Sequence, residues 1–360
     1  MRILFFADSH LGFDLPARPR VKRRRRGYDF QANHERALEA AVRLKVDAVV
    51  HGGDVFHRSR VARSLAHQAF APFERVADKG IPVFVVPGNH ERSRMPHGRA
   101  AAHRQVRVFD RARTYVIDVR GTRVALAGFP YERRGVRHSF ADRLAATGID
   151  SAQADIRVLC MHHCVEGARV GPSDYTFRGA AAVVRARDLP SGVAAVLSGH
   201  IHRHQVLTQD LSARRLPAPV LYPGSVERTS VAEAGETKGF LLLTLAAGGA
   251  GGVLRDWRFL PLPARPLVRC ELEPDGASPS RSHLERMVRQ ALAAYPSDAV
   301  VRLTLRQVAG TPLPWPSADV IRRLAPPSMN VDVVLRDARG ARVVLPQRRR
   351  RNAQPRLADW

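Results

Sequence analysis

Short apolar runs alternate with longer amphipathic stretches through the first half of the chain. The runs are Ile3–Ala7, Ala48–Val50, Val83–Val86, Val124–Ala127, Val158–Met161 and Ala195–Ser198. They are short and rich in Val and Ala, and each is followed by Gly, Asp, His or Pro, a pattern typical of buried strands. His34–Leu44 and Val61–Asp78 carry apolar residues at helical spacing, and Pro72 is expected to break or kink the second helix. Strand–helix–strand alternation predicts an α/β domain.

Three further apolar runs are expected to close this first domain. They are Leu221–Val226, Phe240–Leu245 and Trp257–Leu262, and the Gly-rich stretch Ala246–Gly252 predicts a hairpin-like loop between the last two. Leu260–Pro266 then carries three prolines, which is typical of a linker.

A second, compact pattern follows the linker. The expected order is a strand at Leu267–Leu272, a helix at Ser282–Tyr295, a strand at Ala299–Val308, a helix at Ser317–Leu324 and a strand at Asn330–Arg336. The sequence therefore predicts a first domain at 1–262 and a small α+β domain at 267–340. The basic stretch 346–360 is expected to be a disordered tail.

Charge is the strongest feature of the composition. The 360 residues include 58 Lys and Arg against 33 Asp and Glu, a net charge of +25. Such a surface attracts polyanions, nucleic acid first among them. The sequence contains 3 cysteines and no apolar run near the roughly 18 residues that a membrane helix needs, and its start does not resemble a signal peptide. A cytoplasmic protein without a membrane partner is expected.

Polar side chains that can bind metal follow five of the predicted strands. The segments are Asp8-Ser-His10, Gly53-Asp54-Val-Phe-His57, Gly88-Asn89-His90-Glu91, Met161-His162-His163 and Gly199-His200-Ile-His202. Strand carboxyl ends line one edge of an α/β sheet, so distant segments can converge there. Oxygen and nitrogen donors suit Mn²⁺, Fe²⁺ or Zn²⁺. Seven such side chains are too many for one ion but suit two ions about 3.5–4 Å apart that share a carboxylate.

In this order, the five segments resemble the calcineurin-like metallophosphoesterase superfamily across roughly residues 1–227. The resemblance implies a metallophosphoesterase α/β sandwich with two metal ions. It assigns one ion to Asp8, His10, Asp54 and His202, and the other to Asp54, Asn89, His162 and His200. His90 would serve as general acid or stabiliser of the leaving oxygen. Only one of His162 and His163 is expected to bind metal, because alternation along a strand places them on opposite faces.

Details within the segments resemble the SbcD and meiotic-recombination nuclease branch. They are Asp8-Ser-His10-Leu-Gly12, Asp54-Val-Phe-His57 and Tyr222-Pro-Gly-Ser-Val-Glu-Arg228. The small C-terminal α+β domain stands where that branch has its DNA-capping domain. The resemblance implies a Mn²⁺-dependent DNA nuclease, an exonuclease of repair or recombination that associates with the nucleoid. His57 would then assist at the scissile phosphate.

Other interpretations remain open from the sequence. The same metal site would serve a phosphoesterase for a small nucleotide or a phosphoprotein, and the scaffold could also act as a non-catalytic binding module. The resemblance to the nuclease branch also suggests an SbcC-like ATPase as a partner, and a homodimer. The sequence shows no long C-terminal helical segment of the kind that docks the ATPase, and no interface that argues for the dimer.

A basic run lies shortly after the first metal segment. Its residues are Arg18, Arg20, Lys22, Arg23, Arg24, Arg25 and Arg26. A solvated charge run is one interpretation. Because the run follows Asp8 and His10 so closely, a DNA-binding role at the rim of the active site is the interpretation we carry forward.

Overall fold

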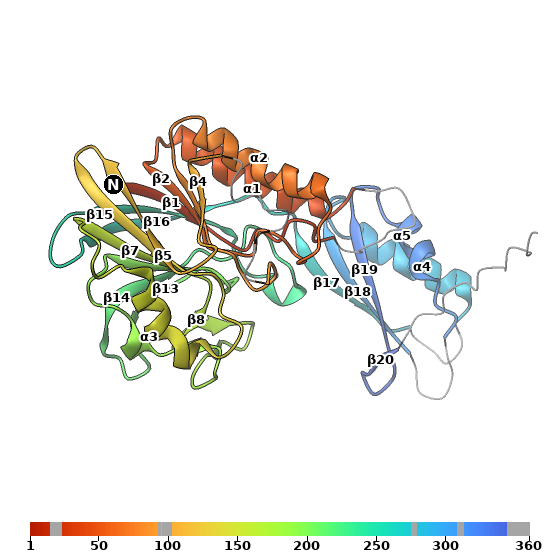
Figure 1. The fold of residues 1–360 in the computed structure, drawn as a ribbon. Helices are drawn as coiled ribbons and strands as arrows, with labels where there is room; N and C mark the ends of the chain where they lie inside the picture. Colours follow the sequence, from red (N-terminus) through yellow and green to blue (C-terminus); the bar gives the residue numbers. More distant parts are fainter. Residues whose placement is uncertain (15–23, 93–94, 96–102, 275–278, 308–312, 344–360) are drawn as a thin grey trace, which may run out of the picture. The chain divides into compact units, whose positions relative to one another are not determined.

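The computed structural model describes residues 1–14, 24–92, 95, 103–274, 279–307 and 313–343. Contacts divide the chain into two units (Figure 1). The first unit contains Met1–Phe13 and Gly27–Ala264, and the second contains Asp14–Arg26 and Arg265–Trp360. The division after Ala264 falls within the proline-bearing segment expected to be a linker. Nothing in the sequence pattern indicated that Asp14–Arg26 belongs with the second unit. The tail expected at 346–360 lies outside the described residues.

The first unit contains two six-stranded sheets. One sheet has the strand order β16-β15-β1-β2-β3-β4. Strands β1 to β4 run parallel to one another, β15 pairs antiparallel with β1, and the edge strand β16 pairs antiparallel with β15. The strands are β1 (Arg2–Phe6), β2 (Ala48–His51), β3 (Val83–Val85), β4 (Val106–Val108), β15 (Gly239–Ala246) and β16 (Val253–Pro261).

The other sheet has the strand order β13-β14-β12-β7-β6-β5. Its central strands β6, β7, β12 and β14 are parallel, with antiparallel strands at both edges. The strands are β5 (Arg113–Val119), β6 (Thr122–Gly128), β7 (Ile156–Met161), β12 (Ala195–Ser198), β13 (Gln205–Gln209) and β14 (Arg215–Tyr222). Short elements follow β7 and β14: β8 (Cys164–Val165), β9 (Arg169–Val170), β10 (Tyr175–Thr176), β11 (Val183–Val184), η2 (Ala186–Asp188) and η3 (Val231–Glu233).

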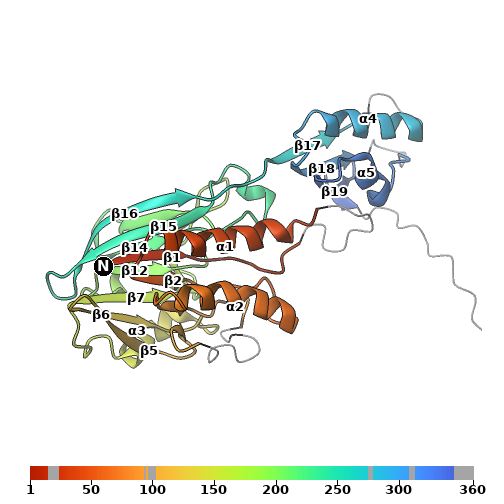
Figure 2. The same ribbon diagram turned by 90° about the horizontal axis from the view of Figure 1, so that it is seen from above.

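The two sheets share one apolar core. Phe5 and Val50 from one sheet and Leu126 and Val158 from the other belong to a single buried cluster. Strands buried on both faces read as continuous apolar runs, which is why the sequence showed runs rather than alternation. Helices α1 (Gly27–Arg43) and α2 (Arg63–Ala77) cover the outer face of the first sheet (Figure 2). Helix α3 (Val136–Thr147) contributes to the buried cluster on the second sheet. The predicted α/β sandwich is confirmed.

Helix α2 corrects one expectation about Pro72. The helix continues through Pro72 from Arg63 to Ala77, so the proline does not break it. Proline removes a helical hydrogen bond, which costs about 3 kcal/mol in a helix interior. The buried face of α2, which includes Phe70, Phe73 and Val76, provides tertiary packing that offsets this loss.

The second unit has the α+β pattern expected from the sequence. Its sheet has the order β17-β18-β19-β20. The elements are β17 (Leu267–Leu272), α4 (Arg281–Ala293), β18 (Val300–Arg306), α5 (Ala318–Leu324), β19 (Asn330–Arg336) and β20 (Arg342–Val343). All were predicted except the short edge strand β20. Within the part of the chain described here, no helix is both long and apolar enough to cross a membrane.

Candidate metal centre

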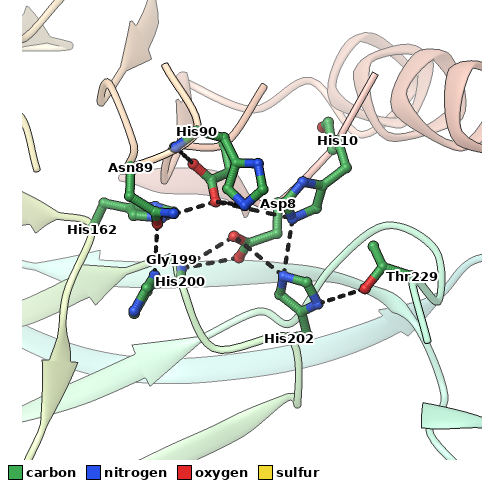
Figure 3. Close-up of polar contacts among 12 residues, drawn as sticks. Asp8, His10, Asn89, His90, His162, Gly199, His200, His202 and Thr229 are labelled. Carbon is green, nitrogen blue, oxygen red and sulfur yellow. Dashed lines mark hydrogen bonds and ion pairs between the residues drawn. The ribbon is translucent and has the colours of Figure 1, made fainter. Parts of the chain in front are cut away.

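The five segments meet at one place in the first unit (Figure 3). They follow β1, β2 and β3 in one sheet and β7 and β12 in the other, at the carboxyl end of each strand. Backbone bonds join the first two segments, from Asp8 N–H to Gly53 O at 2.9 Å and from His10 N–H to Asp54 O at 3.0 Å. The fold therefore brings all seven predicted ligands together.

One group of ligand atoms comes from Asp8, His10 and His202. Their donor atoms lie within 4.8 Å of one another. The Nε2 atoms of His10 and His202 are 2.9 Å apart, and Asp8 Oδ1 is 4.0 Å from His202 Nε2. Asp8 and His10 are buried. These are the residues that the family resemblance assigned to the first ion, apart from the shared carboxylate.

A second group comes from Asp54, His162 and His200, whose donor atoms also lie within 4.8 Å of one another. Asn89 completes it, because its Oδ1 lies 3.1 Å from His162 Nε2 and 2.9 Å from His200 Nδ1. His163 lies outside the group. Its Nε2 accepts a hydrogen bond from the backbone N–H of Glu132 at 3.1 Å.

Asp54 lies between the two groups. Its Oδ2 is 3.3 Å from His162 Nε2 and 3.9 Å from His10 Nε2. Burial acts to raise the pKa of Asp54, but the neighbouring His162 and His10 hold it well below its usual range. The buried carboxylate is therefore an anion that faces both groups, as a bridging ligand must.

The buried carboxyl groups of Asp8 and Asp54 place negative charge in the centre, and positive charge is needed to balance it. Burial raises the pKa of Asp8 to about 6 although His162 and His202 act against this. Burial acts to lower the pKa of His162, yet Asp54 raises it to about 9. A proton on His162 thus neutralises part of the charge of two buried carboxylates. Divalent cations would do the same more completely, so the donor set fits two of them.

Left-handed backbone occurs at four of the ligands. The φ angles are +53° at Asp8, +43° at His10, +53° at Asp54 and +79° at His200. Each such non-glycine residue costs of order 1–3 kcal/mol, which the surrounding structure must offset. Strain concentrated at one set of polar residues is typical of a functional site.

Two glycines allow the ligand segments to approach one another. A Cβ atom at Gly53 would lie 2.3 Å from His162 Nδ1, and one at Gly88 would lie 2.2 Å from Asp54 Oδ1. Neither position can carry a larger residue without moving a ligand. Glycine at these two positions therefore allows the backbone to lie against the ligand side chains.

Partners outside the ligand set orient two of the histidines. His162 Nδ1 donates to Gly52 O at 2.7 Å, which leaves its Nε2 directed at Asp54. His202 Nδ1 lies 3.3 Å from Thr229 Oγ1 and 3.4 Å from Glu233 Oε1. Such contacts fix the ring orientation and the tautomer of a metal-binding histidine. Sequence reasoning missed Thr229 and Glu233, since both lie beyond the last ligand without a motif spacing.

The Glu91 side chain holds together the segments that carry Asp54 and Asn89. Its Oε1 accepts from Phe56 N–H at 2.7 Å, and its Oε2 accepts from Gly88 N–H at 2.7 Å and from Asp54 N–H at 3.1 Å. The side chain is buried. The sequence pointed to Glu91 only as a neighbour of Asn89 and His90 and assigned it no role.

His90 and His57 lie beside the centre, as the resemblance implied. His90 Nδ1 donates to His57 O at 2.7 Å, and its Nε2 is 3.9 Å from Asp54 Oδ2. The His90 side chain is 33% exposed, so substrate can reach it. The His57 ring packs 5.5 Å from the His10 ring. Burial and then the neighbouring His90 lower the pKa of His57 to about 4.

Only part of the basic run near residue 20 can be placed. Arg24 N–H donates to Pro327 O at 3.1 Å, Asn330 Nδ2 donates to Arg24 O at 2.9 Å, and Arg25 pairs with Asp14. These contacts tie this end of the run to the second unit. The Arg26 side chain is buried, so it does not offer the exposed phosphate contact expected of it. The remaining residues lie outside the described part of the chain: Arg18, Arg20, Lys22 and Arg23.

Comparison with known proteins agrees with this geometry. Residues 1–204 match the model of the calcineurin-like phosphoesterase family. The chain is 29% identical over 218 residues to the uncharacterized metallophosphoesterase YhaO of Bacillus subtilis, covering 59% of this chain and 48% of that protein. It is 25% identical to the DNA double-strand break repair protein Mre11 of Saccharolobus solfataricus over 58% of this chain and 51% of that protein. It is also 25% identical to the DNA double-strand break repair protein Mre11 of Aeropyrum pernix, over 81% of this chain and 68% of that protein.

The chain spans about half the length of the first two of these relatives. More than half of it, including every candidate metal ligand, lies within the matched family region. The chain therefore belongs to the calcineurin-like phosphoesterase family.

Proposed function

We propose that the protein is a Mn²⁺-dependent DNA nuclease that hydrolyses phosphodiesters from DNA ends in repair or recombination. The observation that carries the proposal is Asp54, a buried carboxylate with one oxygen between two groups of ligands. In this assignment Asp8, His10 and His202 would hold one ion together with Asp54. Asn89, His162 and His200 would hold the other with the same carboxylate.

Two divalent cations held there would polarise the phosphoryl oxygen and lower the pKa of an attacking water. The protein itself controls the leaving group. The bond from His90 Nδ1 to His57 O leaves Nε2 as the ring atom presented beside Asp54. A protonated His90 can therefore transfer the Nε2 proton to the departing oxygen, and His57 O holds the ring in position for this step.

The choice of DNA rests on the relatives and on charge. Two of the three relatives described above are named as DNA double-strand break repair proteins. The net charge of +25 favours a polyanionic substrate and partner. A phosphoesterase for a small nucleotide or a phosphoprotein is the second candidate, because the relative YhaO is named only as a metallophosphoesterase and the metal centre itself does not select substrate size.

A cleavage assay on end-labelled linear duplex DNA with Mn²⁺ tests the proposal. The wild-type protein should degrade the duplex, and Asp54→Ala should not, because both ions lose a ligand. The ladder of products would give the polarity. Intact DNA together with hydrolysis of a chromogenic phosphodiester would refute the nuclease and support the small-substrate enzyme.

A further inference from the structure

A hollow lined by arginines adjoins the metal centre within the first unit. Its volume is about 410 Å³. The basic residues that line it are Arg92, Arg111, Arg133, Arg134 and Arg143. All five are exposed. They come from the loop after His90, the turn after β4, the segment after β6 and helix α3, so four separate parts of the chain supply positive charge to one place.

The acidic residues in the lining leave most of this charge uncompensated. Asp110 pairs with Arg113 at 2.6 Å, and Glu132 pairs with Arg143 at 2.8 Å. Within the described part of the chain, the side chains of the four other lining arginines have no carboxylate at ion-pair distance: Arg92, Arg111, Arg133 and Arg134. Four unpaired guanidinium groups around one hollow favour an anionic ligand.

Two residues connect the hollow to the metal centre. Tyr131 lines it, and the same ring has its centroid 5.7 Å from that of His200 and 6.1 Å from that of His162. Arg92 is two residues after His90, and its backbone N–H donates to Asn89 O at 3.1 Å. The hollow therefore begins beside the ligands of the second group.

We propose that this hollow binds the backbone phosphates of a polynucleotide strand next to the phosphodiester being cleaved. The proposal rests on the function proposed above. A mononucleotide offers one phosphate, whereas four guanidinium groups spread over the lining suit successive phosphates of one strand. Tyr131 adds an aromatic ring to the lining, and proteins that hold single strands combine such rings with a positively charged groove.

The test compares two triple variants with equal loss of charge. Arg111→Ala, Arg133→Ala and Arg134→Ala remove charge from the hollow. Arg215→Ala, Arg255→Ala and Arg258→Ala remove it from exposed strand positions outside the lining. The probe is a fluorescein-labelled oligothymidylate of about 15 nucleotides, within the usual site sizes of strand-binding proteins. Fluorescence anisotropy in EDTA, which prevents cleavage, gives Kd over a series of salt concentrations.

The hollow variant should bind about tenfold to a hundredfold more weakly than wild type at 0.1 M salt, and its slope of log K against log salt should be smaller by about 2. The control variant should lose threefold or less. Equal losses in both variants would overturn the inference, as would a wild-type Kd for thymidine monophosphate equal to that for the oligonucleotide. Failure of the wild type to cleave DNA would refute the proposed nuclease separately, because the binding comparison needs no turnover.

Discussion

Replacing Glu91 with Gln would test whether this buried carboxylate holds the metal segments in place. The change keeps the shape of the side chain and removes one of its two acceptor oxygens. In the structure these oxygens accept three backbone N–H groups, those of Asp54, Phe56 and Gly88. The amide oxygen of Gln can replace Oε2 and serve Asp54 and Gly88. The amide NH₂ then faces the N–H of Phe56, donor against donor.

The expected loss follows from that one contact. Leaving a buried N–H without an acceptor costs about 1–3 kcal/mol. In a unit of this size, 1 kcal/mol corresponds to about 2–4 °C in Tm. Glu91→Gln should therefore lower Tm by roughly 2–12 °C. The two segments that carry Asp54 and Asn89 should also bind Mn²⁺ more weakly.

Thermal unfolding in EDTA and calorimetric titration with Mn²⁺ would measure the two effects. Glu39→Gln is the matched control, because it makes the same chemical change at an exposed position of α1 and should stay within about 0.5 kcal/mol of wild type. If Glu91→Gln unfolds and binds Mn²⁺ as the control does, the hydrogen bonds to Glu91 do not support the centre and the reasoning is wrong.

Four further outcomes can be measured. Asp54→Asn should lower the Mn²⁺ content measured by elemental analysis to one ion or none per chain, since both groups use this carboxylate. His90→Gln should keep both ions and lose about 10²–10⁴ in kcat, and a loss of metal with activity would count against the acid role. Glu233→Gln should weaken Mn²⁺ binding about 10–100-fold in calorimetry by freeing the His202 ring. Burial lowers the pKa of His34 to about 4, so the unfolded chain takes up its proton first as pH falls below 6.5. In urea unfolding His34 should contribute up to about 1.4 kcal/mol per pH unit to the loss of stability from pH 6.5 towards pH 4, and His34→Gln should reduce the slope of that part of the profile by this amount.

The interior strands were predictable because each is buried on both faces. Ala48–Val50 and the other interior strands are continuous apolar runs. A helix at the surface or a loop would carry polar residues, so these runs indicated buried strands. The edge strand β5 was missed for the opposite reason. Its pattern Arg-Thr-Tyr-Val-Ile-Asp-Val is only partly buried and mixes polar with apolar residues. The persistence of α2 through Pro72 was missed because the burial of Phe70 and Phe73 is a tertiary effect that local propensity does not contain.

In the candidate metal centre, the ligands could be predicted from the sequence, but the residues that position them could not. Its ligands stand directly after strands, so order and spacing were enough to place Asp8, Asp54 and His162 near one another. The residues that position them could not be recognised by spacing. Thr229 and Glu233 lie 27 and 31 residues beyond His202, in the segment after β14, and the sequence does not specify that this segment returns to His202.

The net charge of +25 led us to expect a polyanionic partner, but the sequence alone did not indicate which part of the surface would bind it. The basic run that ends at Arg26 has a buried side chain at that end, and Arg24 makes contacts within the second unit. Arg92, Arg111 and Arg133 near the ligands are exposed and have no carboxylate at ion-pair distance among the described residues. They come from separate segments that only the fold assembles. A run of like charges along a chain must be solvated or paired locally, whereas charges gathered by tertiary structure can remain unpaired where a ligand will neutralise them. The contrast between the two triple arginine variants measures that difference directly.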